Sequence, residues 1–372
     1  MRYSAYDALG YPAAMWLPIM PGAGPVALLG YTKAGIILEK WFSPINKKRL
    51  KPSLKSRLGT DYIIYTSRLF GAKLPKPQYV ATDEAWKIAR WMSDTIKIHG
   101  GCCLATYISS AMRICQAARE MGIDLKGAVF SVSSEPFTAA KKREIEASGA
   151  SVHSMYAFME AGIVGLECAN PAVTDDNHLL SDCFALIQRP REVKYSGVTV
   201  DAFLFTSLLK SSPKVLLNVE NGDYGVIESR SCGCKLEKAG FGFHLHSIRG
   251  FDKLTGEGMS FVGSDIIRII EEALPSKFGG NPNMYQMVEE EDEKGHTHLS
   301  IIVSPEVGEI DEDALLKFML AELSKGKDTQ RLMVEIWAKT NTMRVKRIKP
   351  IVTTRGKLLP LHIQNKSKKI IG

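Results

Sequence analysis

Two cysteines one residue apart, Cys232 and Cys234, stand in the segment Ser-Cys-Gly-Cys-Lys. Thiols at this spacing rarely reach disulfide geometry, and two thiolates supply only half of the four ligands of a structural zinc ion. If this pair binds zinc, the other ligands come from elsewhere in the chain. His244 and His246 are close in sequence and would complete a Cys2His2 site. The alternative is a pair of turn thiols without a metal.

The chain has 372 residues, of which 45% are hydrophobic and 24% charged, and its net charge is +8. This composition is typical of a globular protein of about two domains. The basic residues are scattered, apart from residues 47–57 and 366–369, whereas a nucleic-acid-binding protein usually concentrates them on one element. We therefore predict no nucleic-acid partner and a charge that suits the phosphates of a nucleotide or coenzyme A. Seven cysteines without a signal peptide indicate a reducing, cytoplasmic compartment.

An apolar stretch covers residues 13–29 and contains Pro18, Pro21 and Pro25. Three prolines in so short a segment are incompatible with a lipid-exposed helix, so we predict no membrane span. We expect a loop that leads into a buried strand at residues 25–30.

The next part of the chain alternates between helical and strand patterns. A Thr-Asp cap opens a helical pattern at residues 83–98, and a second helical pattern covers 107–121. Residues 127–132 and 152–156 have the pattern of short buried strands, with a helix between them that ends at Gly149. Strand, helix and strand in succession predict an α/β fold with a parallel layer.

Two changes of pattern follow. Strand-like segments at 183–188, 199–206, 215–219 and 226–229, with a turn at Asn221-Gly222-Asp223, predict an antiparallel or barrel-like subdomain at about 165–248. Beyond Arg249, helices at 263–274 and 311–323 alternate with strands at 284–289, 298–303 and 333–337. This alternation predicts a smaller C-terminal α+β domain at 249–372.

Four segments, in this order, resemble the adenylate-forming (acyl- and aryl-CoA ligase) superfamily, in particular its phenylacetate–CoA ligase and acyl-protein synthetase branch. The segments are Ser134-Glu135-Pro136-Phe137, residues 156–162 (YAFMEAG), residues 217–223 (LNVENGD) and residues 354–357 (TRGK). The resemblance implies a truncated ligase N-terminal domain at 1–248 and a C-terminal lid domain at 249–372. Arg249, Phe251 and Asp252 resemble the family's interdomain hinge.

The resemblance implies that an aryl or fatty carboxylic acid is activated with ATP as an acyl-adenylate and passed to coenzyme A or to an acceptor protein. It implies that Lys357 supplies a cation at the phosphates and that Glu160 binds Mg²⁺. It also implies that Asp223 holds the ribose. The remaining implied nucleotide contacts are Ser134, Glu135, Pro136, Tyr156 and Arg249. On local grounds, Glu160 could instead be a carboxylate at a helix N-terminus, Asp223 a turn residue, Lys357 a solvated loop lysine and Arg249 a surface residue.

The sequence also departs from this family. It has no Ser/Thr/Gly-rich phosphate loop, and Ala157 and Met159 replace the usual Gly and Thr. Such a loop supplies N–H groups to the phosphates of ATP. Activation is therefore expected to need the loop either from an N-terminal partner polypeptide or from a longer chain of which this sequence is a fragment. The alternatives are a catalytically degenerate binding protein and an acyltransferase that uses preformed acyl-adenylate.

The resemblance extends to the cysteine pair. Cys168 and His178 stand in segments similar to those that precede a Cys-x-Cys element in several phenylacetate–CoA ligases. The resemblance therefore implies a structural zinc bound by Cys168, His178, Cys232 and Cys234, in place of the local set with His244 and His246.

Overall fold

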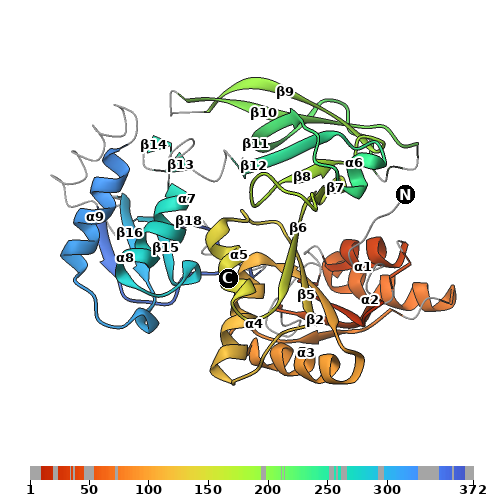
Figure 1. Cartoon of the computed structure of the whole chain (residues 1–372), viewed down its shortest axis with the longest axis horizontal. Helices are drawn as coiled ribbons and strands as arrows, with labels where there is room; N and C mark the ends of the chain where they lie inside the picture. Colours follow the sequence, from red (N-terminus) through yellow and green to blue (C-terminus); the bar gives the residue numbers. More distant parts are fainter. Residues whose placement is uncertain are drawn as a thin grey trace.

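The computed structural model describes residues 10–19, 24–33, 35–36, 38–45, 54–71, 74–193, 198–210, 212, 214–250, 255–256, 259–260, 266–291, 297–325, 343–353 and 356–364. Their main feature is a twelve-stranded sheet with the strand order β3-β2-β1-β4-β5-β6-β7-β8-β12-β11-β10-β9. A four-stranded sheet lies beside it in the C-terminal part (Figure 1).

The first half of the large sheet is parallel, as the sequence predicts. Every strand pair from β3 to β6 is parallel. The strands are β1 (Ala13–Trp16), β2 (Leu38–Ser43), β3 (Pro77–Tyr79), β4 (Cys102–Tyr107), β5 (Ala128–Ser133) and β6 (Ser151–Phe158). The helices are α1 (Gly24–Lys33), α2 (Leu54–Leu69), α3 (Trp86–His99), α4 (Ile108–Glu120) and α5 (Ala139–Glu146). Both the α/β class and the predicted helices at 83–98 and 107–121 are confirmed.

Helix α3 illustrates why these segments fold as they do. Its Ile88, Ala89 and Met92 recur at helical spacing and pack against Leu104 of β4 and Phe130 of β5 in one buried cluster. Gly100 ends the helix in the left-handed conformation, with φ of 77°.

The strand predicted at residues 25–30 is wrong, because these residues form helix α1. The buried strand lies earlier in the same apolar stretch, at β1. Pro25 takes the second position of α1, where its missing N–H removes no helical hydrogen bond. A short apolar run has no periodicity that separates a buried strand from a buried helix. No helix in the described ranges is both long enough and apolar enough to span a membrane.

The second half of the sheet is antiparallel, and β6 belongs to both halves. Its strands are β7 (Gly162–Glu167), β8 (Asn177–Leu179), β9 (Phe184–Val193), β10 (Val198–Ser207), β11 (Val219–Ser229) and β12 (Phe243–Gly250). The turn predicted at Asn221-Gly222-Asp223 is wrong, because these residues lie inside β11. Gly222 has φ of 81°, and the pairing of β11 with β12 shifts its register between Tyr224 and Val226. Both irregularities bend the strand locally without ending it.

The C-terminal part has the predicted α+β pattern and the sheet order β17-β16-β15-β18. Its elements are β13 (Thr255–Gly256), β14 (Met259–Ser260), α7 (Ile266–Arg268), a π-helical turn (Ile269–Ala273), α8 (Leu274–Phe278), β15 (Tyr285–Glu291), β16 (Thr297–Val303), α9 (Glu312–Ser324), β17 (Met343–Lys346) and β18 (Leu361–Gln364). The strand predicted at 333–337 and the hinge residues Phe251 and Asp252 lie outside the described residues.

The two parts are packed together. Val200 and Ala202 of β10 belong to the same buried cluster as Ile266, Met287 and other apolar side chains of the C-terminal part. The segment before β18 also reaches the large sheet, because the N–H of Leu358 donates a hydrogen bond to Glu135. This return brings residue 357 to the end of β5.

Candidate nucleotide site and cysteine–histidine cluster

Glu135 lies in the loop that follows β5 and closes the N-terminal end of α4. Its carboxylate accepts hydrogen bonds from the N–H of Ser109 at 2.7 Å and from the hydroxyl of Ser109 at 2.8 Å. A carboxylate is favoured there because the first N–H groups of a helix have no partner within the helix. Ser134, just before it, has φ of 71°, which turns the chain sharply at the end of the strand.

Lys357 reaches this loop from the C-terminal part. Its ammonium group donates to the carbonyl oxygen of Ser134 at 3.3 Å and lies 5.0 Å from the centre of the Tyr107 ring. The N–H of the next residue, Leu358, donates to Oε1 of Glu135 at 3.1 Å. The structure thus places Lys357 beside residues 134–136, and it is not an isolated loop lysine.

The side chains of Tyr156, on β6, and Asp223, on β11, are in direct contact. The Tyr156 hydroxyl donates to Oδ2 of Asp223 at 2.8 Å. The amide of Asn221 donates to both, at 2.8 Å to Tyr156 and 3.0 Å to Asp223. Burial, together with the Asp223 charge, raises the pKa of Tyr156, so the phenol stays protonated and remains a donor. The sequence reasoning gave no role to Asn221, although it stands two residues before Asp223.

Glu160 and Arg249 occupy the same half of the sheet. Glu160 is exposed in the turn between β6 and β7, so the alternative of a helix N-terminal carboxylate is wrong. Arg249 lies opposite Tyr224, next to Asp223 in the β11–β12 pairing. Its Nη1 lies 3.3 Å from the carboxylate of Asp175 and donates to the Ile248 carbonyl at 2.7 Å. Arg249 is therefore held in place and is not a free surface arginine.

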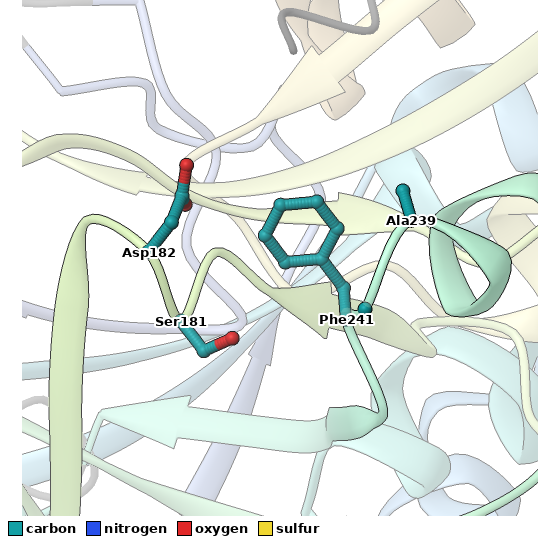
Figure 2. Close-up of a pocket in the computed structure, with 5 residues that line it drawn as sticks. Ser181, Asp182, Ala239 and Phe241 are labelled. Carbon is teal, nitrogen blue, oxygen red and sulfur yellow. The ribbon is translucent and has the colours of Figure 1, made fainter.

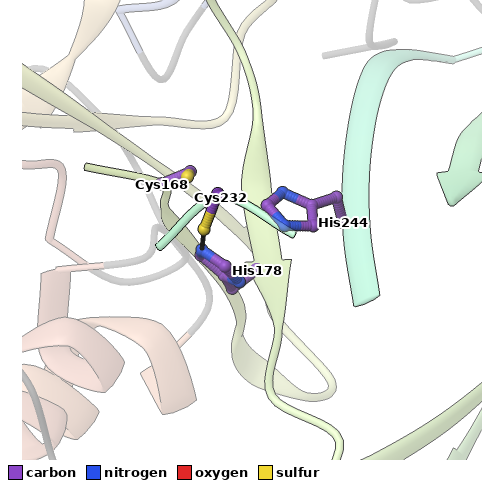
Figure 3. A group of neighbouring side chains, drawn as sticks. All are labelled: Cys168, His178, Cys232 and His244. Atoms are coloured by element: carbon purple, nitrogen blue, oxygen red, sulfur yellow. Dashed lines mark hydrogen bonds between the residues drawn. The ribbon is translucent and has the colours of Figure 1, made fainter. Parts of the chain in front are cut away.

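A cluster of metal-ligand side chains lies where β7, β8 and β12 meet the loop after β11. Ligand atoms of Cys168, His178, Cys232 and His244 all lie within 4.8 Å of one another (Figure 3). The β8–β12 register places His178 directly opposite His244, with ring centres 4.1 Å apart. We call these four residues together with Cys234 the cysteine–histidine cluster.

Cys234 joins the cluster through His178. Its sulfur lies 3.1 Å from Nε2 of His178, and the sulfur of Cys232 lies 3.6 Å from the same nitrogen. The structure therefore brings all four predicted zinc ligands together. It also brings in His244 from the rival set but not His246, which contacts Ser247 and Glu228 instead.

Both imidazoles of the cluster are oriented by acceptors on their far side. Nδ1 of His178 donates to the Phe241 carbonyl at 2.7 Å, and Nδ1 of His244 lies 2.7 Å from the carboxylate of Asp176. With the proton on Nδ1, each Nε2 keeps a lone pair for a metal ion, and Nε2 of His178 lies beside the thiols of Cys232 and Cys234. Nε2 of His244 is buried and has no partner within the described structure. Burial also lowers the pKa of His178, which favours the neutral ligand form.

Two carboxylates that the sequence reasoning missed support the cluster. Asp176 is fully buried and accepts from the Ala172 N–H, Arg230 and His244. Burial acts to raise the pKa of Asp176, but these three donors hold it below its ordinary value.

Glu237 supports the Cys-Gly-Cys segment. It accepts from the Ser231 hydroxyl at 2.6 Å, from the Cys232 N–H at 2.9 Å and from the Gly233 N–H. These bonds lower the pKa of Glu237 to about 2. Asp176 can be recognised only from the structure, because its partners Arg230 and His244 are distant in the sequence. Glu237 could have been found from the sequence, because it follows Cys234 by three residues.

A surface hollow of about 420 Å³ lies beside the cluster, lined by Ser181, Asp182, Ala239, Gly240 and Phe241 (Figure 2). This lining has one carboxylate and no basic side chain, so it does not suit a phosphate. The hollow also contains none of the residues predicted to bind a nucleotide.

No protein-family model and no curated protein matches the chain. Solved structures similar to it include an anthranilate CoA ligase, AuaEII, in complex with anthranoyl-AMP, with TM-score 0.47 and 12% identity over 94% of this chain and 58% of that one. Another is an acyl-CoA synthetase from Brucella canis, with TM-score 0.36 and 16% identity over 90% and 59% of the two chains. A third is the amide bond synthetase Mcba from Marinactinospora thermotolerans, with TM-score 0.46 and 12% identity over 91% and 66%.

The chain thus spans 58% and 59% of the lengths of the first two of these structures. Because all three TM-scores lie below 0.5, we infer function from the geometry of the site alone.

We expect Glu135→Ala to lower the free energy of unfolding by about 1–3 kcal/mol, because it leaves the buried N–H groups of Ser109 and Leu358 without their acceptor. Urea unfolding measures the change. The matched control is Glu146→Ala on α5, whose ion pair with Lys142 spans 3.9 Å at the surface and is expected to contribute less than about 1 kcal/mol. Equal effects of the two changes would show that Glu135 does not join the segments.

Proposed function

We propose that the chain binds an acyl-adenylate at Ser134–Pro136, Tyr156, Asp223 and Lys357, as an AMP-forming acyl- or aryl-CoA ligase does. The observation that carries this proposal is the contact of Lys357 with Ser134, because it brings a cation from the C-terminal part to a strand-end loop. The carboxyl ends of parallel strands are where α/β folds usually bind ligands. Asp223, also paired with Tyr156, adds an acceptor for hydroxyl groups.

The proposed reaction has two steps. An oxygen of the substrate carboxylate attacks the α-phosphorus of ATP, the bond to pyrophosphate breaks, and an acyl-adenylate forms. The thiolate of coenzyme A, or of an acceptor protein, then attacks the acyl carbon and AMP leaves. Negative charge accumulates at the α-phosphate in the first step, and a fixed ammonium stabilises it.

Each side chain has a defined part in this proposal. Lys357 places its charge at the α-phosphate, and Asp223 accepts hydrogen bonds from the ribose hydroxyls. Glu160, an exposed carboxylate in the turn after Tyr156, is accessible to a hydrated cation and would hold Mg²⁺. When bound, Mg²⁺ supplies neutralisation of the phosphate charge. Arg249, opposite Tyr224 and in contact with Asp175, is proposed as a further nucleotide contact beside Asp223.

The second candidate function is that of an acyltransferase that uses preformed acyl-adenylate. These 372 residues contain no Ser/Thr/Gly-rich phosphate loop, the element that supplies N–H groups to the β- and γ-phosphates in the activation step. Transfer from a preformed acyl-adenylate needs none of these contacts. A chain that activates the acid itself is proposed to need a partner polypeptide that carries the loop, and a chain that performs neither step is a binding protein.

Binding of a non-hydrolysable acyl-adenylate analogue tests the shared part of these functions. A ligand at 100 times its dissociation constant stabilises the native state by about 2.7 kcal/mol, which raises the melting temperature. Panels of aryl and fatty acyl analogues, AMP, ATP and coenzyme A identify the ligand class. Asp223→Asn is expected to reduce the shift, whereas Asp182→Asn, an exposed aspartate outside the site, retains it. Absence of a shift with every adenylate analogue refutes the proposal.

Lys357→Ala separates the two steps. We expect the loss of at least about a hundredfold in acyl-AMP formation, because the cation acts on the charge that forms at the α-phosphate. Transfer to coenzyme A from synthetic acyl-AMP is expected to change little. Lys349→Ala, on the same C-terminal segment but paired with Glu306, is the control. Parallel loss of both steps would contradict the assigned role.

We also propose that the cysteine–histidine cluster binds one structural zinc ion. Ligands at about 2.0–2.3 Å from a tetrahedral zinc lie about 3.5 Å from one another. The 3.1 and 3.6 Å separations between the sulfur atoms and Nε2 of His178 are close to that value. The cluster allows two sets of four ligands. Both contain Cys168, His178 and Cys232, and the fourth ligand is Cys234 in one and His244 in the other.

Elemental analysis is expected to find about one zinc per chain. Cys168→Ser and His178→Ala should each remove it and lower the melting temperature. Cys234→Ser and His244→Ala distinguish the two sets, because only the true fourth ligand abolishes stoichiometric zinc. His246→Ala serves as the control, since this histidine contacts Ser247 and Glu228. Zinc that persists after both Cys168→Ser and His178→Ala would refute the site.

A further inference from the structure

A buried ion pair connects the two parts of the chain. Nζ of Lys141, on α5, lies 2.7 Å from the carboxylate of Glu271, in the π-helical turn. The two side chains are only 4% and 3% exposed. Lysine and glutamate are almost never buried to this degree unless they are paired, so the contact constrains both segments.

Each charged group makes a further hydrogen bond to the loop after β5. Lys141 donates to the carbonyl oxygen of Pro136 at 3.1 Å, and the Thr138 hydroxyl donates to Glu271 at 2.8 Å. This is the loop that accepts hydrogen bonds from Lys357 and Leu358 on its other side. The ion pair therefore supports the surface on which the Lys357 segment rests.

The contact around the ion pair is polar. The amide of Asn283 donates to the carbonyl of Ser109 at 3.0 Å, while its Oδ1 is buried without a partner within the described structure. A cavity of about 10 Å³, lined by residues that include Lys141, Glu271, Asn283 and Leu358, lies between the two parts. A polar cavity of this size has room for about one water molecule. These polar groups add to the apolar cluster that also joins the two parts.

We propose that Lys141 and Glu271 are positioning residues that hold the C-terminal part in the arrangement in which Lys357 reaches Ser134. A buried ion pair loses the hydration of both charges and regains that energy only while both partners are in contact. Removal of one partner leaves an unpaired buried charge, and separation of the surfaces then costs less free energy because that charge is rehydrated. The expected effect of these residues on acyl-AMP formation rests on the proposed function. Their expected effect on the contact between the two parts of the chain does not.

Hydrogen exchange of the native full chain tests the contact directly. Glu271→Gln and Lys141→Met are each expected to reduce protection at least about tenfold in peptides that cover residues 134–141 and 356–364. Protection of the core strands β4 and β15 should remain. The double variant Lys141→Met/Glu271→Leu removes both charges and is expected to restore protection, since no unpaired charge remains.

Lys142→Met is the matched control, because Lys142 lies on the same helix but pairs with Glu146 within that helix. Unchanged protection at both segments in the single variants refutes the proposal. Equal loss in β4 and β15 refutes it as well, because that pattern indicates a general role in stability. If a single variant does not fold, the double variant decides: protection at 134–141 and 356–364 below that of the wild type contradicts the positioning role, and wild-type protection supports it.

The chemical consequence is measured separately. The single variants are expected to lose acyl-AMP formation about tenfold while transfer from synthetic acyl-AMP is retained, and the double variant recovers the first step. If the wild-type chain forms no acyl-AMP and binds none, the proposed function fails while the exchange result still decides the role of the ion pair. If the wild type is active and the single variants match it in both steps, the ion pair has no positioning role.

Discussion

The carboxylate of Glu135 is the contact on which the arrangement of the candidate site depends. It accepts from Ser109 at the start of α4 and from the N–H of Leu358, whose segment comes from the C-terminal part. A helix N-terminus needs an acceptor in any case, because its first N–H groups have no partner within the helix. Here the acceptor is shared with a segment that is distant in the sequence. The local requirement of one helix therefore fixes where Lys357 lies, because Lys357 directly precedes Leu358.

In the second half of the sheet, strand register fixes the positions of the candidate site residues. The β8–β12 pairing sets His178 opposite His244, and the β11–β12 pairing sets Asp223 opposite Gly250 and next to the Arg249 position. Since β12 takes part in both pairings, a shift of one residue would turn its side chains to the opposite faces of the sheet. The cysteine–histidine cluster and Asp223 are therefore held in mutual register by one strand. Asp176, directly before β8, reinforces that strand because it contacts His244 on β12.

The sequence predicts the elements better than it predicts their partners. The helix at 83–98 is identified because Ile88, Ala89 and Met92 recur at helical spacing, although the Thr-Asp cap predicted for it is wrong: Thr82–Glu84 form a 3-10 turn, and the helix begins at Trp86 after Ala85. The apolar residues 25–30 carry no such period, and the strand predicted there is a helix. The turn predicted at Asn221-Gly222-Asp223 follows from residue types that favour turns, but the strand continues through them: Gly222 takes φ of 81° and Asp223 pairs with Gly250 of β12. Glu271 and Lys141 could not be paired from the sequence, because nothing local brings a π-helical turn to α5.

The cysteine–histidine cluster combines what the sequence indicates with what only tertiary structure provides. The spacing of Cys232 and Cys234 indicates a need for outside ligands, and the resemblance supplies Cys168 and His178, which the structure brings to them. It also adds His244, whose Nδ1 contacts a buried aspartate and whose Nε2 is buried without a partner within the described structure. Five donors around a point that takes four ligands leave one in reserve, and a donor in reserve must find another partner. Cys234 and His244 are both buried, but the Cys234 sulfur lies 3.1 Å from Nε2 of His178, whereas a buried imidazole nitrogen without a partner is costly. The cost of an unpaired buried atom therefore falls on Nε2 of His244 more than on the sulfur of Cys234, and binding of a metal ion by that nitrogen would remove it.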